Sequence, residues 1–157
     1  MNRRAFLMGA VAVPFALRTP LALAASLPTA VIHTDPLCGC CGAWIEHLVE
    51  AGFPVDVRET REMNRIKARL GIPGDLVSCH TAEIDGYLVE GHVPADAIKR
   101  LLAERPDARG LSVPGMPIGS PGMEVAGMED DTYDVILFGP SGQSSFARYR
   151  GGVLVKA

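Results

Sequence analysis

Three cysteines within four residues constrain this chain more than any other feature of its sequence. They lie in Cys38-Gly39-Cys40-Cys41, directly after a short β-branched segment and directly before a helical pattern. The fourth and last cysteine, Cys79, lies far along the chain beside His80. The fold must therefore place these thiols as a disulfide, a redox couple or a soft-metal site.

The amino terminus predicts export, which affects the interpretation of the cysteines. Arg3-Arg4 precede an uncharged apolar run over residues 8–17, and Ala22-Leu23-Ala24 supplies the small residues of a cleavage site. The run is about ten residues long, whereas a helix needs roughly 20 to span a bilayer. We predict a twin-arginine export signal over residues 1–24, a periplasmic location and no membrane attachment after cleavage.

The remaining residues, 25–157, have the size of a single domain with one core. Loss of Arg3, Arg4 and Arg18 with the signal leaves 12 basic against 18 acidic residues, so the net charge changes from −3 to −6. An acidic chain without a run of Lys or Arg argues against nucleic acids and anionic lipids as partners. It is compatible with the handling of cations.

Hydrophobic periodicity predicts a mixed α/β fold. Asp85-Gly86 predicts the tight turn of a β-hairpin. The expected elements are a strand over 29–34, a helix over 41–51, a strand over 55–58, a helix over 62–70, a hairpin over 76–91, a helix from Pro94, a Met/Pro/Gly-rich ordered loop over 110–127 and a C-terminal β-hairpin over 133–149. The order β-α-β-α-β-β-α, with the cysteine loop after the first strand, predicts a thioredoxin-like fold.

The position of the thiols allows two kinds of chemistry. Cys40 and Cys41 lie at the expected amino terminus of a helix, where free N–H groups favour the thiolate. Cys38 and Cys41 form a CxxC pair, which is sufficient for thiol–disulfide exchange. In a thioredoxin-like domain the residues before the third strand lie against this loop, so Cys79 would face the other three cysteines. Four converging thiolates suit copper(I), zinc or an iron–sulfur cluster, and the tight CxCC spacing favours copper(I) ions that share sulfurs.

Histidine and methionine offer further ligands. His80 adjoins Cys79 and needs a bend to join it, because neighbouring side chains on a strand point to opposite faces. His33 and His92 remain open as ligands, although a turn or capping role is commoner at the position of His92, and His47 is expected to be exposed. Methionines in the Pro/Gly loop are either soft ligands or apolar cover for the core. The predicted metal ligands are Cys38, Cys40, Cys41, Cys79, His80, Met116 and Met123.

Several motifs together resemble the CopG-type family of small periplasmic copper-resistance and metal-binding proteins. They are Cys38-Gly39-Cys40-Cys41, Ser78-Cys79-His80-Thr81, Asp85-Gly86-Tyr87, residues 90–94 (EGHVP), residues 113–117 (VPGMP) and residues 119–124 (GSPGME). The resemblance covers nearly all of the chain beyond the signal. It implies a thioredoxin-like fold and copper bound by the four cysteines, with a sulfur-bridged multinuclear cluster among the arrangements left open.

Three functional hypotheses follow. The leading one is a periplasmic copper-binding protein for copper resistance or homeostasis, which holds Cu(I) at the four cysteines and exchanges it with periplasmic donor or acceptor proteins. Whether it also interconverts Cu(I) and Cu(II) as an enzyme is left open. The alternatives are a thiol–disulfide oxidoreductase that uses Cys38 and Cys41, and a binding module stapled by disulfides.

Overall fold

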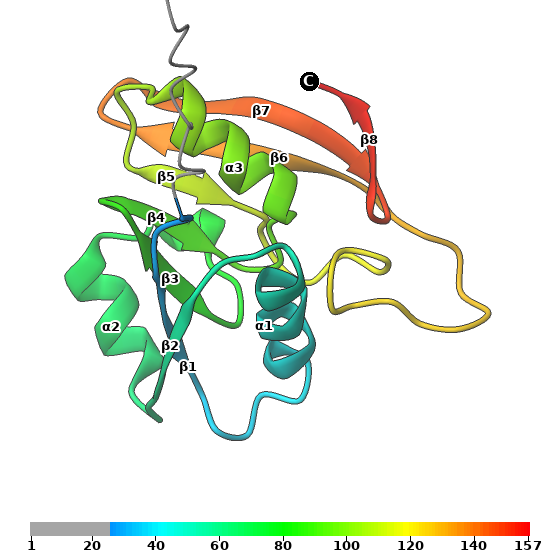
Figure 1. The fold of residues 1–157 in the computed structure, drawn as a ribbon, viewed down its shortest axis with the longest axis horizontal. Helices are drawn as coiled ribbons and strands as arrows, with labels where there is room; N and C mark the ends of the chain where they lie inside the picture. The colour runs from blue at the N-terminus through cyan, green and yellow to red at the C-terminus, as the bar shows by residue number, and fades with distance from the viewer. Residues whose placement is uncertain (1–25) are drawn as a thin grey trace, which may run out of the picture.

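One mixed β-sheet of eight strands organises the part of the chain that the computed structural model describes, residues 26–157 (Figure 1). The predicted export signal lies outside these residues. The strands are ordered β2-β1-β3-β4-β5-β6-β7-β8 across the sheet. In chain order the elements are β1 (Ala30–Thr34), α1 (Cys41–Glu50), β2 (Val55–Glu59), α2 (Met63–Leu70), the 3-10 helix η1 (Gly74–Leu76), β3 (Thr81–Ile84), β4 (Tyr87–Glu90), α3 (Ala95–Glu104), β5 (Gly110–Ser112), β6 (Thr132–Gly139), β7 (Gly142–Arg150) and β8 (Val153–Lys156).

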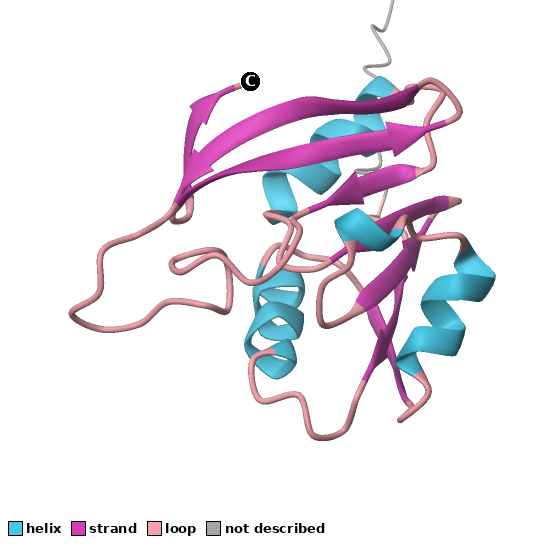
Figure 2. Cartoon of the chain, turned by 180° about the vertical axis from the view of Figure 1, so that it is seen from behind, coloured by secondary structure: helices cyan, strands magenta, loops and turns pink. Residues whose placement is uncertain are grey.

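The helices cover both faces of the sheet (Figure 2). Helices α1 and α3 pack on one face, where Trp44, Leu48 and Ile98 belong to the main apolar core. A smaller core on the α2 side contains Ile72 and Leu76. None of the helices within residues 26–157 is long and apolar enough to cross a membrane.

Strand β3 lies between β1 and β4 and runs antiparallel to both. His33 near the end of β1 is opposite Thr81 at the start of β3, and Thr81 is opposite Glu90 at the end of β4. Strand β5 is parallel to β4, with Ser112 opposite Glu90. The segments that follow β1, β4 and β5, and the segment that precedes β3, therefore leave the sheet at one end. We call it the cysteine end.

Most of the predicted elements are present, and the differences have local causes. The elements from β1 to α3 follow the predicted alternation of strands and helices, and the parallel pairing of β1 with β2 is confirmed. The Asp85-Gly86 turn is also confirmed, because both residues have positive φ angles. The strand predicted from residue 76 is wrong up to residue 80, because the chain first forms η1 and then bends at Cys79 before β3 begins.

The sheet is larger than the predicted thioredoxin-like one. Strand β5 occupies the start of the predicted loop over 110–127, and it is only three residues long, so its pairing with β4 and β6 defines it. The predicted terminal hairpin is present as β6 and β7, but it does not close the chain. Strand β8 follows and pairs antiparallel with β7 after a turn at Gly151-Gly152.

Gly91 makes the turn that separates β4 from the following helix. Its φ angle is +74°, and an added Cβ would lie 2.5 Å from both the Ser78 hydroxyl oxygen and the Val113 carbonyl oxygen. Only glycine fits both the backbone conformation and the space. The turn lets Glu90 and His92 both point into the protein, and both are buried.

We predict that Gly91→Ala destabilises the protein more than Gly86→Ala does. Gly86 has a similar φ of +87° but open space around it, so its substitution costs only the left-handed backbone strain, about 1–2 kcal/mol. Gly91→Ala adds a steric overlap of about 1–3 kcal/mol. Urea unfolding of the two variants measures the difference, and equal losses would contradict the close packing of this turn.

Candidate metal centre

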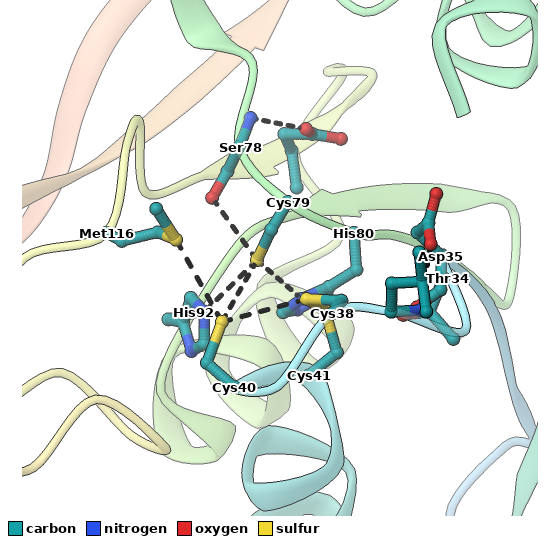
Figure 3. Close-up of a disulfide and its surroundings, with 12 residues drawn as sticks. Thr34, Asp35, Cys38, Cys40, Cys41, Ser78, Cys79, His80, His92 and Met116 are labelled. Carbon is teal, nitrogen blue, oxygen red and sulfur yellow. Dashed lines mark hydrogen bonds between the residues drawn. A yellow bond between two sulfur atoms is a disulfide. The ribbon is translucent and has the colours of Figure 1, made fainter. Parts of the chain in front are cut away.

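All four cysteine sulfurs converge at the cysteine end (Figure 3). They lie within 4.8 Å of one another. Cys40 is the N-cap residue of α1 and Cys41 its first residue, as predicted. Cys40 is central, because its Sγ lies 3.7 Å from Cys38 Sγ and 3.8 Å from Cys79 Sγ. The predicted approach of Cys79 to the CxCC loop is therefore present in the structure.

Cys38 and Cys41 are joined by a disulfide, with an S–S distance of 2.05 Å and Cα atoms 5.6 Å apart. Cys40 and Cys79 are free. The expectation of four thiolates therefore does not describe this redox state, because the CxxC spacing suits a disulfide and removes two thiolates from the donor set. Reduction of this bond would make all four sulfurs available to a metal.

Two histidines approach the free thiol of Cys79. His80 Nδ1 and His92 Nε2 each lie 3.2 Å from Cys79 Sγ, and these three residues form a second cluster whose potential ligand atoms lie within 4.8 Å of one another. The bend at Cys79 allows its side chain and that of His80 to meet, which a regular strand would prevent. On the sequence alone, His92 is a weaker candidate ligand than His80. His92 lies just after β4, at the same end of the sheet as Cys79. This position is the sequence signal that favours His92 as a ligand.

The hydrogen bond on its far side orients the His92 ring. His92 Nδ1 lies 2.8 Å from the Pro121 carbonyl oxygen, which can only accept, so Nδ1 carries the proton. Nε2 then presents its lone pair to Cys79, as a metal-ligating histidine requires. The next residue, Gly122, packs closely against α1, because an added Cβ would lie only 2.6 Å from the Trp44 backbone nitrogen.

Two aromatic rings pack against the His80 ring. Its ring centroid lies 4.2 Å from that of Trp44 and 5.0 Å from that of His92. Within residues 26–157, no hydrogen-bond partner reaches its buried Nε2. Its Nδ1 is therefore its only polar contact with the cluster, through Cys79.

Burial sets the protonation of these groups. It lowers the pKa of His80 and His92, so both rings are neutral at neutral pH and suited to bind a metal. Burial, reinforced by the neighbouring Cys40, raises the pKa of the Cys79 thiol to about 12. In the metal-free protein Cys79 therefore keeps its proton at neutral pH, and a metal that binds there must displace it.

The remaining predicted or open ligands separate into near and remote ones. Met116 is near, with its Sδ 3.9 Å from Cys40 Sγ, although half of the residue is exposed. Met123 makes no such contact with the cysteines in the described part of the chain; its backbone N–H donates to the Ser120 carbonyl. His33 lies 2.9 Å from Glu83 on β3 and not in the cluster.

His47 is not freely exposed, contrary to the prediction. It is half-buried, and its Nε2 accepts a hydrogen bond from the Ala95 backbone N–H at the start of α3. Burial lowers its pKa, which keeps the ring neutral and able to accept. This histidine ties α1 to α3 and lies outside the two cysteine-containing clusters.

Known proteins with similar features include copper-resistance proteins. Two solved structures, both described as copper resistance protein CopG, in form 2 and form 1, share 47% sequence identity with this chain and have TM-scores of 0.73. The form 2 match covers 78% of this chain and 98% of that one; the form 1 match covers 80% and 99%. Residues 76–123 match DUF411, a family described as a protein of unknown function. No curated protein sequence matches the chain.

We predict an unusual pH profile for alkylation of Cys79 by iodoacetamide in the metal-free protein. Only the thiolate reacts, so an ordinary thiol with a pKa of about 8.5 reaches its maximal rate near pH 9–10. Because the pKa of Cys79 is raised to about 12, its rate should still climb roughly tenfold per pH unit between pH 8 and 10. Mass spectrometry of the modified peptides follows Cys79 separately from Cys40. A rate that levels off near pH 9 would contradict the buried environment of this thiol.

Proposed function

This chain belongs to the CopG family of copper-resistance proteins, and on that premise we propose that it binds copper(I) through Cys38, Cys40, Cys41 and Cys79. The observation that carries the proposal is the convergence of the four sulfurs within 4.8 Å. Thiolates are soft donors that select copper(I) over hard cations. The function that follows is copper resistance or homeostasis, with copper as the cargo.

The donor set favours copper(I) over a structural zinc ion. Zinc sites usually take four independent tetrahedral ligands, whereas Cys38, Cys40 and Cys41 crowd into four residues. Sulfur separations of 3.7 and 3.8 Å around Cys40 are compatible with sulfurs shared between neighbouring ions. We therefore propose a multinuclear copper site, with His92 and His80 as nitrogen donors beside Cys79 and Met116 as a thioether donor at the rim. Met123 is the one predicted ligand for which no contact among residues 26–157 offers support.

The disulfide supports a redox role at the same site. Oxidation of the Cys38 and Cys41 thiols to the disulfide releases two electrons and two protons, which is sufficient to reduce two copper(II) ions to copper(I). The reverse reaction restores both thiolates at the expense of an external two-electron donor. We propose that copper(I)/copper(II) interconversion accompanies binding.

The cellular setting and fold relation are part of the same proposal. The sequence pattern that predicts a twin-arginine signal over residues 1–24 supports export to the periplasm, where donor and acceptor proteins would exchange copper with this site. We propose that the unit from β1 to α3 is thioredoxin-like and that β5 to β8 extend it. Supporting this are the strand order β2-β1-β3-β4 and the parallel pairing of β1 with β2 beside two antiparallel pairings.

Thiol–disulfide exchange is a second candidate function, because the Cys38–Cys41 disulfide is present. The role of Cys40 distinguishes thiol–disulfide exchange from copper binding. An exchange enzyme needs only the CxxC pair, whereas Cys40 is the central sulfur of the proposed copper site.

We predict that Cys40→Ser abolishes most copper binding and leaves any exchange activity intact. The test loads fully reduced protein with copper(I) under anaerobic conditions and counts copper per chain after gel filtration, beside an insulin-reduction assay. Less than about one copper per unmodified chain, or unchanged copper content in Cys40→Ser, would refute the copper proposal. Insulin reduction that survives Cys40→Ser would then favour exchange.

Met116→Leu tests the thioether donor, and Met128→Leu is its matched control. The two methionines are exposed to nearly the same extent, 53% and 54%, but only Met116 approaches Cys40. We expect Met116→Leu to weaken copper(I) affinity, measured by competition with a chromogenic chelator, by about 3–30-fold, while Met128→Leu leaves it unchanged. Equal affinities of both variants would exclude Met116 from the site.

A further inference from the structure

A buried ionic network lies behind the cysteine end, on the α2 side of the sheet. Lys67 of α2, Thr81 of β3 and Glu90 of β4 are 6%, 0% and 0% exposed. Lys67 Nζ donates to Glu90 Oε1 at 2.5 Å and to Thr81 Oγ1 at 2.8 Å. Thr81 Oγ1 in turn donates to Glu90 Oε2 at 2.6 Å. Each of the three side chains is thus hydrogen-bonded to the other two.

The network extends to the cysteine segment through one backbone group. The Ser78 N–H donates to Glu90 Oε1 at 2.6 Å, and Ser78 directly precedes Cys79. Residues 77–80 belong to no strand or helix, so their backbone groups need partners outside a β-ladder. The Gly115 N–H donates to the Val77 carbonyl, and the Gly91 N–H donates to the His80 carbonyl. Glu90 is the ionisable partner among these contacts.

We propose that Glu90, held in place by Lys67, is a positioning residue that fixes residues 77–80, the Cys79 turn, for metal binding. The proposal rests on the copper-binding function. In this proposal Glu90 and Lys67, which are not metal ligands themselves, orient the Cys79 sulfur.

Stability alone does not account for a charged pair at this place. Burial of two charges costs desolvation free energy, and apolar residues of similar volume often serve the fold equally well. What apolar residues cannot supply is an acceptor for the Ser78 N–H. A carboxylate gives this bond the strength of a charge-assisted contact, and Lys67 and Thr81 fix the carboxylate's orientation.

The geometry connects this bond to two proposed ligands. The Ser78 N–H is part of the Val77–Ser78 peptide, which the bond to Glu90 holds in one orientation. Rotation of that peptide would displace the next residue, and Cys79 Sγ would move relative to Cys40 Sγ, 3.8 Å away, and His92 Nε2, 3.2 Å away. Glu90 also lies two residues before His92, across the constrained turn at Gly91. Metal sites tolerate displacements of only about 0.2 Å from ideal ligand distances, so a loosened turn would weaken binding without removing a donor.

Two double variants test the positioning role while leaving no unpaired buried charge. Lys67→Met/Glu90→Leu removes the acceptor of the Ser78 N–H, and Lys67→Met/Glu90→Gln keeps a neutral amide oxygen that can replace it. We expect copper(I) affinity to fall about 10–100-fold in the first variant and by a smaller factor in the second. In the metal-free proteins, amide hydrogen exchange at Ser78 should accelerate in the same order. The sulfur-to-copper absorption bands of the loaded first variant should also shift.

Tyr133→Phe is the matched control for lost stability. It removes a buried hydrogen bond from the tyrosine hydroxyl to the Gly151 carbonyl, away from the cysteines, and should leave affinity and Ser78 exchange unchanged. Equal affinity losses in this control and in the first double variant would overturn the proposal. So would unchanged affinity and Ser78 exchange in a folded double variant. If the leucine variant does not fold, the glutamine variant decides by the same criteria.

Failure of the copper-binding function would be recognised separately. If the unmodified reduced protein takes up no copper(I), that function is refuted, and the metal-free readouts still judge the role of Glu90. Faster Ser78 exchange and altered Cys79 alkylation in the double variants would then support the positioning of this turn. Unchanged values of both would overturn it.

Discussion

The antiparallel pairing of β3 with both β1 and β4 is the constraint on which the site depends. A strand antiparallel to its two neighbours starts where they end. The start of β3 therefore lies beside the ends of β1 and β4, with Thr81 opposite both His33 and Glu90. The CxCC loop follows β1, Cys79 and His80 precede β3, and His92 follows β4. The backbone pairing of these strands thus brings together the three segments that carry sulfur and imidazole.

The segments that converge at the cysteine end are irregular, so their backbone groups and side chains need partners elsewhere in the structure. Backbone groups outside helices and strands need other partners when buried, and side chains close to a metal need fixed orientations. The Pro121 carbonyl orients His92, and the Glu90 carboxylate binds the Ser78 N–H. Apolar packing of α1 and α3 supports one face of the sheet, while the Lys67–Glu90 pair is buried on the other.

Features encoded locally were predictable from the sequence, and features that depend on distant neighbours were not. Helix α1 and the Asp85-Gly86 turn follow from nearby residues. The approach of Cys79 was predictable because the order of elements implies the pairing of β3 with β1. Strand β5 could not be found, since a three-residue strand exists only through its neighbours. Lys67 was missed for a similar reason: a lysine on a helix is almost never fully buried unless paired, and its partner Glu90 lies on another element.

Disulfide formation and metal binding draw on the same sulfurs, which couples the two candidate chemistries. A sulfur in the Cys38–Cys41 disulfide is not a thiolate, so oxidation leaves Cys40, Cys79 and the two histidines as donors, and reduction adds two thiolates. Cys79 belongs to both clusters. It is not part of the Cys38–Cys41 disulfide, so no covalent bond links its position to the redox state of that pair. If the Cys79 turn is held firmly, the Cys79 sulfur would therefore occupy the same position in both redox states. The proposed positioning of Cys79 through the Glu90–Ser78 hydrogen bond would therefore affect metal binding in both redox states.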